Sequence, residues 1–300
     1  MKTSDIGRRE MIKQSAGAII GLVLTGCISS DTKSARPSQK GFKVGICEWI
    51  LANSEGSKTV EIANEIAKNI GVDGIQLNFN TSARPIHLQK PEIRDEYIKA
   101  ANKCGLQIPS IALTELNNVP LKGNDPRAER WLSESIDSCR AIGSKTVLVP
   151  FFGKGDLLGD EKGMDVVVEK LKKISPEAEK AGVTLAIESY LTAEQLLDII
   201  NRVNSSAIGV YYDVANSQSK GYDICREIRF LGKHIAEFHA KDNDGLYGKG
   251  SIDFKAVRSA IDDISYRGWL QIEGTKTPLG IEESYRYDLQ YLRKIFPPSA

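Results

Sequence analysis

From Phe42 onward, short apolar runs alternate with longer amphipathic stretches, and this alternation constrains the fold more than any other feature of the sequence. Apolar runs of strand length, separated by helix-length stretches, predict parallel strands joined by helical crossovers. Eight such runs occur, spaced about 25 to 38 residues apart. They are Lys43 to Cys47, Gly74 to Leu77, Gln107 to Ala112, Thr146 to Val149, Thr184 to Ile187, Ile208 to Tyr212, Ile235 to Phe238 and Trp269 to Ile272.

Glycines precede several of these runs, at the points where the preceding helices should end. They are Gly71, Gly105, Gly143, Gly182 and Gly268. A glycine at this point adopts the left-handed backbone that stops a helix before the next strand begins. Eight units without a spare strand predict an α/β fold, a closed (β/α)8 TIM barrel that forms a single domain over residues 42–300. A doubly wound open sheet is the alternative, but no GxGxxG motif follows the first run.

The charge balance limits the partners of this chain. Its 40 Lys and Arg residues nearly match its 39 Asp and Glu residues, which leaves a formal charge of +1. No long-range field is therefore available to attract nucleic acid or an acidic surface. A small neutral or weakly charged ligand is expected instead. The five cysteines include no CxxC pair, so we interpret those beyond residue 27 as small apolar residues.

The first 27 residues are typical of an export signal. Arg8 and Arg9 are followed by an apolar run that is too short to span a bilayer as a helix. The pattern resembles a twin-arginine signal, and the LTGC sequence that ends at Cys27 resembles a bacterial lipobox. We therefore predict an exported protein, periplasmic or at the cell surface, that meets a membrane only through a lipid anchor at Cys27. Residues 28–41 are expected to be a flexible tether. An ordinary N-terminal helix with a chance cysteine is the alternative.

Polar residues end four consecutive runs in the second half of the chain. They are Glu188, Asp213, His239 and Glu273. In a parallel barrel the carboxyl ends of the strands meet in one mouth, so these side chains are expected to converge there. Three carboxylates and one imidazole suit a divalent cation such as Mn, Mg, Co or Fe, with Zn as a further option. Each acidic residue alone would be explained as a helix N-cap, but four successive strand ends are much harder to explain in that way.

Other residues near the strand ends are candidates for contact with a ligand. Trp49, Phe79, Phe151 and Phe152 follow predicted strands and form either an apolar wall for a sugar ring or ordinary packing. Gln76 and Glu115 stand near the ends of the second and third strands, where their side chains are candidates for contact with substrate hydroxyls. The residue pattern leaves both interpretations open.

Three segments carry a resemblance to a known family: YYDVANSQSKGYD, IAEFHAKDNDGLYGKGSIDF and GWLQIEG. They resemble the sugar phosphate isomerase/epimerase superfamily with the xylose isomerase-like barrel. The resemblance implies that Glu188, Asp213, His239 and Glu273 bind one divalent metal ion, and that Lys241 lies near the substrate. Ketose 3-epimerases of this superfamily have a histidine where this chain has Asn216. We expect Asn216 to contact the substrate. They also have an arginine where this chain reads NDG after the seventh strand, so the identity of their substrate cannot be carried over to this chain.

Such a site predicts proton chemistry beside a carbonyl group. Glu188 and Glu273 would be the catalytic residues of a sugar isomerase or epimerase that works through an enediolate. Export argues for a free sugar or keto-sugar. A twin-arginine substrate folds before it crosses the membrane and so acquires its metal inside the cell, which favours a weakly held ion such as manganese. A lyase or hydrolase-like enzyme that acts on 3-keto-glycosides is one alternative, and a non-catalytic carbohydrate-binding lipoprotein is another. A nuclease is disfavoured by the neutral charge. The sequence leaves homo-oligomerisation open.

Overall fold

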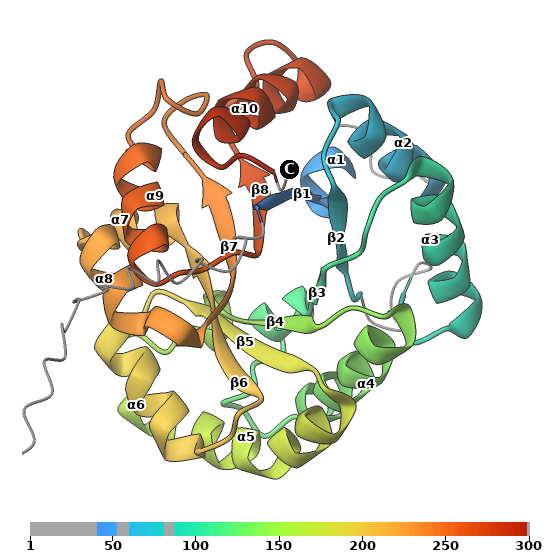
Figure 1. Ribbon diagram of the computed structural model, residues 1–300. Coiled ribbons are helices and arrows are strands. Elements are labelled where there is room, and N and C mark those ends of the chain that lie inside the picture. Colours follow the sequence, from blue (N-terminus) through green and yellow to red (C-terminus); the bar gives the residue numbers. More distant parts are fainter. Residues whose placement is uncertain (1–40, 53–59, 81–86, 299–300) are drawn as a thin grey trace, which may run out of the picture. The chain divides into compact units, whose positions relative to one another are not determined.

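The computed structural model describes residues 41–52, 60–80 and 87–298, which form a closed barrel of eight parallel strands (Figure 1). Each strand pairs with the next one in the sequence, and β8 closes the barrel against β1. The strands are β1 (Lys43–Cys47), β2 (Gly74–Asn78), β3 (Ser110–Ala112), β4 (Thr146–Phe151), β5 (Thr184–Ser189), β6 (Ile208–Asp213), β7 (Ile235–Lys241) and β8 (Trp269–Gly274). The predicted α/β TIM barrel is confirmed.

Helices cover the outside of this barrel, as the alternating pattern predicts (Figure 1). They are α1 (Glu48–Ala52), α2 (Val60–Ile70), α3 (Pro91–Cys104), α4 (Pro126–Ile142), α5 (Glu161–Ala181), α6 (Ala193–Val203), α7 (Val214–Ser219), α8 (Ile224–Leu231), α9 (Phe254–Asp263) and α10 (Ile281–Ile295). Helices α3, α4 and α5 end at left-handed glycines, Gly105, Gly143 and Gly182. Before β8 the left-handed residue is Ser265 (φ 56°) and not the predicted Gly268.

The third strand is shorter than the sequence predicts. It begins at Ser110, whereas the apolar run begins at Gln107. Pro109 interrupts the run, and proline has no backbone N–H to donate to a neighbouring strand. Gln107 retains only an isolated bridge to Gly74 on β2.

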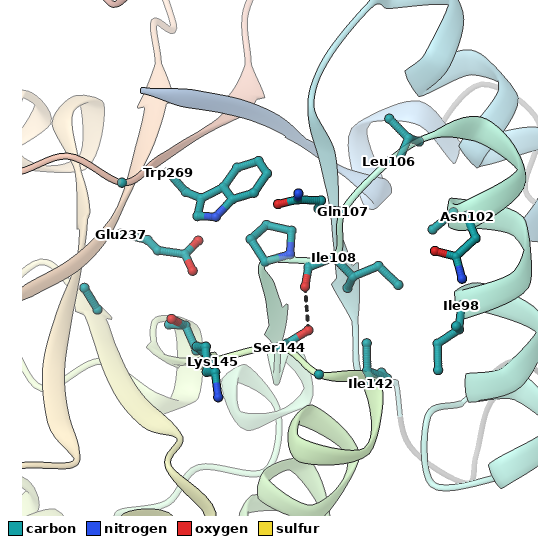
Figure 2. Close-up of a pocket in the computed structure, with 16 residues that line it drawn as sticks. Ile98, Asn102, Leu106, Gln107, Ile108, Ile142, Ser144, Lys145, Glu237 and Trp269 are labelled. Atoms are coloured by element: carbon teal, nitrogen blue, oxygen red, sulfur yellow. Dashed lines mark hydrogen bonds between the residues drawn. The ribbon is translucent and has the colours of Figure 1, made fainter. Parts of the chain in front are cut away.

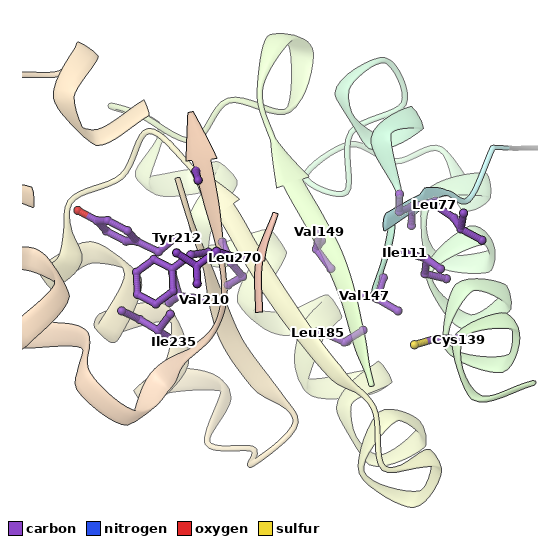
Figure 3. Packing of buried hydrophobic residues seen from close by; sticks show 14 of the residues in the cluster. Leu77, Ile111, Cys139, Val147, Val149, Leu185, Val210, Tyr212, Ile235 and Leu270 are labelled. Atoms are coloured by element: carbon purple, nitrogen blue, oxygen red, sulfur yellow. The ribbon is translucent and has the colours of Figure 1, made fainter. Parts of the chain in front are cut away.

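The outward side chains of the strands form the main hydrophobic core, between the barrel and its helices (Figure 3). Leu77, Ile111, Val147 and Leu185 belong to this layer and are fully buried. Phe79 and Phe151 are fully buried members of the same core. The structure therefore places these two candidates for an apolar wall in the outer packing, because their side chains point away from the barrel interior.

A smaller cluster fills the barrel interior. Ala112, Leu148, Ala186 and Tyr211 form it, and Trp49 packs against it. Deeper in the barrel, the fully buried Glu237 accepts hydrogen bonds from Ser110 and Tyr211 at 2.9 and 3.0 Å. The interior is therefore packed with side chains and is not a pore. A reaction site is therefore expected at the C-terminal ends of the strands, beyond these layers.

The predicted signal over residues 1–27 and nearly all of the predicted tether lie outside the described residues. Among the helices that the structure describes, none combines the length and apolar character that a membrane span requires.

Candidate metal centre

Four side chains meet at the C-terminal end of the barrel. They are Glu188 on β5, Asp213 on β6, His239 on β7 and Glu273 on β8. One ligand atom from each side chain lies within 4.8 Å of the ligand atoms of the other three. Ligands at about 2.1 to 2.4 Å from a shared cation lie up to roughly 4.2 to 4.8 Å apart. The spacing of this tetrad, the name we use for the four side chains, therefore fits one ion.

The imidazole of His239 is held between two of the carboxylates. Its Nδ1 atom lies 2.8 Å from Oε1 of Glu188 and 3.4 Å from Oε2 of Glu273. Burial acts to lower the pKa of His239, but the carboxylates of Glu273 and Glu188 outweigh it and raise this pKa well above the ordinary value. The Nδ1 edge of the ring therefore faces the concentration of negative charge.

The two carboxylate oxygens of Asp213 have different surroundings. Its Oδ1 atom accepts hydrogen bonds from the backbone N–H groups of Ala215 and Asn216, at 2.7 and 2.8 Å, and so caps α7. Its Oδ2 atom is buried and has no hydrogen-bond partner among the described residues. Burial, reinforced by the nearby Glu273, raises the pKa of Asp213 to about 7. The cap explains one oxygen, and the other remains for a cation.

Lys241 is the cationic side chain beside these carboxylates. Its Nζ atom donates to Oε2 of Glu273 at 3.0 Å and lies 3.6 Å from Oδ2 of Asp213. Three acidic side chains thus gather around one lysine and one histidine. A divalent cation would balance the remaining negative charge, and carboxylate and imidazole donors suit Mn, Fe, Co or Zn. The residues present therefore fit the predicted metal.

Two further side chains lie behind His239, on the side away from the carboxylates. The Nε2 atom of His239 lies 2.8 Å from Oε1 of Gln76 and 3.5 Å from the sulfur of Cys47. The thiol of Cys47 also donates to Oε1 of Gln76 at 3.1 Å. Burial raises the pKa of this thiol to about 12. Gln76 is fully enclosed against His239. Its placement therefore differs from the expected contact with substrate hydroxyls.

The other expected substrate contacts lie at the open end. Trp49 is half-buried, and its ring centroid is 6.1 Å from that of His239 in an edge-to-face arrangement. Asn216 is 9% exposed in the first turn of α7 and is tied to Asp213 through its backbone. The chemical role of Trp49 and of Asn216 remains a prediction, as does that of Lys241.

Sequence reasoning missed Cys47 and Tyr190. The ring of Tyr190 lies 4.8 Å from that of Phe152 and carries the Nζ atom of Lys220 at 4.0 Å. Alternation along β1 would have placed Cys47 on the inner face with Gly45, two positions before it, whereas Tyr190 lies just beyond the end of β5 and no strand pattern applies to it. Residues two apart on a strand share a face.

A cavity of about 480 Å³ lies at the other end of the barrel, where the strands begin (Figure 2). Its lining includes Glu237, Trp269, Gln107 and Lys145, and none of the tetrad. In TIM barrels the chemistry occurs at the C-terminal ends of the strands. We therefore place the candidate site at the tetrad and not at this cavity.

Comparisons with known proteins agree with the barrel fold. Residues 65–295 match a family model described as the xylose isomerase-like TIM barrel. Over 181 residues the chain is 25% identical to the 2-epi-5-epi-valiolone 7-phosphate 2-epimerase of Actinoplanes sp., covering 60% of this chain and 65% of that protein. Over 231 residues it is 26% identical to the inosose isomerase of Bacillus velezensis, covering 70% of this chain and 81% of that one.

The fold is also found in solved structures. The D-allulose 3-epimerase from Methylomonas sp., in complex with D-allulose, has a TM-score of 0.71 at 14% sequence identity. The match covers 86% of this chain and 98% of the other. At this identity the likeness concerns the fold alone.

Proposed function

Because the chain belongs to the xylose isomerase-like TIM barrel family, we propose that it is a divalent-metal-dependent isomerase or epimerase of a free sugar or keto-sugar. The observation that carries this proposal is the tetrad, whose ligand atoms converge within 4.8 Å at the open end of the barrel. The names of two relatives, an epimerase and an isomerase, support the same type of reaction.

Glu188, Asp213, His239 and Glu273 would hold the metal, for which we favour Mn²⁺. When bound, such an ion polarises a carbonyl and so makes the hydrogen on the neighbouring carbon more acidic. Two backbone N–H groups donate hydrogen bonds to Asp213 and keep its carboxylate fixed at the start of α7. Positions fixed in this way reduce the reorganisation that a reaction requires.

Glu188 and Glu273 are the proposed proton carriers. They come from β5 and β8, and each contacts Nδ1 of His239 with one of its oxygens. The second oxygen of each carboxylate is then available to take or return a proton. Removal by one glutamate and return to the opposite face by the other would invert the carbon through an enediolate. Return to the neighbouring carbon would instead give isomerisation.

The substrate is proposed to lack a phosphate group. Lys241 is already engaged by Glu273 and Asp213, and Lys220 lies on the ring of Tyr190. The half-buried Trp49 offers an apolar surface of the kind on which sugar rings pack. One relative is named for a phosphorylated substrate and the other is not, so both classes of substrate belong in the test.

The proposal is tested by deuterium uptake in heavy water with added Mn²⁺. The substrate panel contains free keto-sugars, the matching sugar phosphates and 3-keto-glycosides. We expect uptake at one carbon of a free keto-sugar, and a loss of about 10²- to 10⁴-fold in Glu188→Gln and Glu273→Gln. Glu237→Gln is the matched control, because Glu237 is a buried glutamate of the barrel interior that contacts Ser110 and Tyr211.

Each outcome has a distinct meaning. Uptake with sugar phosphates alone would contradict the free-sugar assignment. Cleavage or elimination of a 3-keto-glycoside would assign the site to the lyase or hydrolase-like alternative. Binding of sugars without any uptake would favour a carbohydrate-binding lipoprotein, and uptake that survives removal of all metal would exclude the metal-dependent mechanism.

We also propose that the protein is exported and lipid-anchored at Cys27. The proposal rests on the charged, then apolar N-terminal segment and its LTGC ending. Labelling of expressing bacteria with a radioactive fatty acid is expected to mark the parent but not Cys27→Ala. Equal labelling of the two proteins, or of neither, would contradict the anchor.

A further inference from the structure

The two ring nitrogens of His239 have different surroundings. Nδ1 faces the carboxylates of Glu188 and Glu273. Nε2 faces the opposite way, towards the side-chain oxygen of Gln76 at 2.8 Å and the sulfur of Cys47 at 3.5 Å. Only Nδ1 therefore points to the space that the tetrad shares. Nε2 is the atom through which neighbouring side chains can fix the orientation and the protonation of the ring.

A neutral imidazole carries one N–H group, and the other nitrogen provides the lone pair that binds a metal. An amide oxygen can only accept a hydrogen bond, so the oxygen of Gln76 requires the proton to be on Nε2. In the metal-free site the carboxylates of Glu188 and Glu273 also favour a proton on Nδ1. When a metal displaces that proton, the one held by Gln76 stays on Nε2 and the lone pair is on Nδ1, where the carboxylates are. We propose that Gln76 is a positioning residue, which fixes the tautomer and the ring orientation of His239 for metal binding.

The amide group of Gln76 needs its own orientation to be fixed. If it were reversed, its NH₂ group would face Nε2 and would favour a proton on Nδ1, where the metal should bind. Cys47 opposes this reversal, because its thiol donates to the same oxygen of Gln76 at 3.1 Å. Cys47 and Gln76 are direct partners across the β1–β2 pairing, so their side chains share the inner face of the barrel.

Complete burial strengthens this arrangement. Cys47, Gln76 and His239 are each 0% exposed, and the contacts of the Gln76 amide are made by its oxygen, since its nitrogen has no hydrogen-bond partner among the described residues. A buried polar group that loses its partner pays the cost of desolvation without compensation. The contact between Gln76 and His239 should therefore persist before and after a ligand enters the mouth.

This inference rests on the proposed metal centre, and its test measures metal affinity and not turnover. Isothermal titration of Mn²⁺ into the metal-stripped protein is expected to show binding that is about 10- to 100-fold weaker in Gln76→Leu than in the parent. Gln76→Glu keeps an acceptor facing Nε2, and we expect it to restore the affinity to within about threefold. Cys47→Ala removes the thiol donor, and a loss of about fivefold is expected.

Gln271→Leu is the matched structural control. Gln271 is equally buried and is the direct partner of His239 across the β7–β8 pairing, but its amide nitrogen donates to Oε2 of Glu237 at 3.4 Å, and among the described residues no hydrogen bond joins Gln271 to His239. Thermal unfolding of the metal-free variants shows whether the two leucine substitutions destabilise the fold to a similar extent. The positioning role predicts that only Gln76→Leu loses Mn²⁺ affinity.

The outcomes separate this inference from the proposed function. A parent protein that binds no Mn²⁺ would refute the metal centre itself. A parent that binds Mn²⁺, together with Gln76→Leu of equal affinity or with Gln271→Leu equally weakened, would overturn the positioning role alone. If Gln76→Leu does not fold, the Mn²⁺ affinities of Gln76→Glu and Cys47→Ala are compared with that of the parent. A Gln76→Glu affinity more than about threefold below the parent's would overturn the acceptor role of position 76. A Cys47→Ala affinity equal to the parent's would refute the role of Cys47.

Discussion

Asp288 on α10 offers a quantitative test of the electrostatics around the open end of the barrel. Its side chain is fully buried, and its Oδ1 atom accepts the backbone N–H of Tyr247 at 2.8 Å. The hydroxyl of Tyr247 in turn donates to the backbone oxygen of Ala240 and lies 3.4 Å from that of Gly274. These backbone groups are next to His239 and Glu273 in the sequence. Asp288 thus supports the loop that follows β7.

The magnitude follows from the pKa of this carboxyl group. Burial, with Asp242 nearby, raises the pKa of Asp288 from 3.8 to about 7. Its Oδ2 atom has no partner among the described residues. A raised pKa means that the folded state is stabilised by protonation, so this contribution is complete below about pH 4 and is lost as the pH rises through about 7. A difference of about three pH units corresponds to roughly 4 kcal/mol, and solvent screening reduces it to about 2 to 4 kcal/mol.

Asp288→Asn imitates the protonated side chain at every pH. We expect the variant to match the parent near pH 4 and to exceed its free energy of unfolding by about 2 to 4 kcal/mol at pH 8. Urea unfolding of the metal-free proteins, followed by tryptophan fluorescence between pH 4 and pH 8, measures this difference. Asp242→Asn is the control with the opposite sign. It exchanges an acceptor of three backbone N–H groups for an amide, and we expect it to destabilise the fold by about 1 to 3 kcal/mol.

A difference between Asp288→Asn and the parent that stays constant with pH would contradict a raised pKa of Asp288. It would mean that the carboxyl group of Asp288 has the same pKa in the folded and the unfolded chain.

Three further predictions concern the tetrad and the interior of the barrel. Asp213→Ser keeps an oxygen that can cap α7, whereas Asp213→Ala does not, so thermal unfolding without metal should show the alanine variant less stable by about 1 kcal/mol. Mn²⁺ should stabilise neither variant, and stabilisation of either one would argue against Asp213 as a ligand. Lys241→Met removes a positive charge 3.0 Å from Glu273, so calorimetric titration should show tighter Mn²⁺ binding, and weaker binding would count against the charge argument. Gly45→Ala places a methyl group against the side chain of Gln271 inside the barrel, so urea unfolding should show a loss of about 1 to 3 kcal/mol; an unchanged midpoint would mean that Gln271 moves aside freely.

The barrel and the tetrad were predictable because both depend on local patterns. The apolar runs mark the strands, and parallel strands bring their carboxyl ends to one mouth. Glu188, Asp213, His239 and Glu273 each end one run, so their convergence follows from closure of the sheet. The early end of β3 was also visible in principle, because Pro109 lacks the N–H that the predicted strand would need.

Contacts across the barrel were not predictable in the same way. Which side chain of β2 meets His239 of β7 depends on strand tilt and stagger, which the residue pattern does not contain. Gln76 therefore looked like a contact for substrate hydroxyls, and Cys47 looked like simple packing. Phe79 and Phe151 had the opposite problem. Their positions in the sequence suggested the mouth, but they follow Leu77 and Val149 by two residues, so alternation along the strand places them in the outer core with these residues.

We propose that four side chains from consecutive strands bind one divalent ion. Crystals of the metal-loaded protein, measured at the manganese absorption edge, test it most directly. We expect one anomalous peak per chain, about 2.0 to 2.6 Å from one donor atom of each of Glu188, Asp213, His239 and Glu273. A peak at another place, or no peak in protein that chemical analysis shows to contain manganese, would contradict the claim.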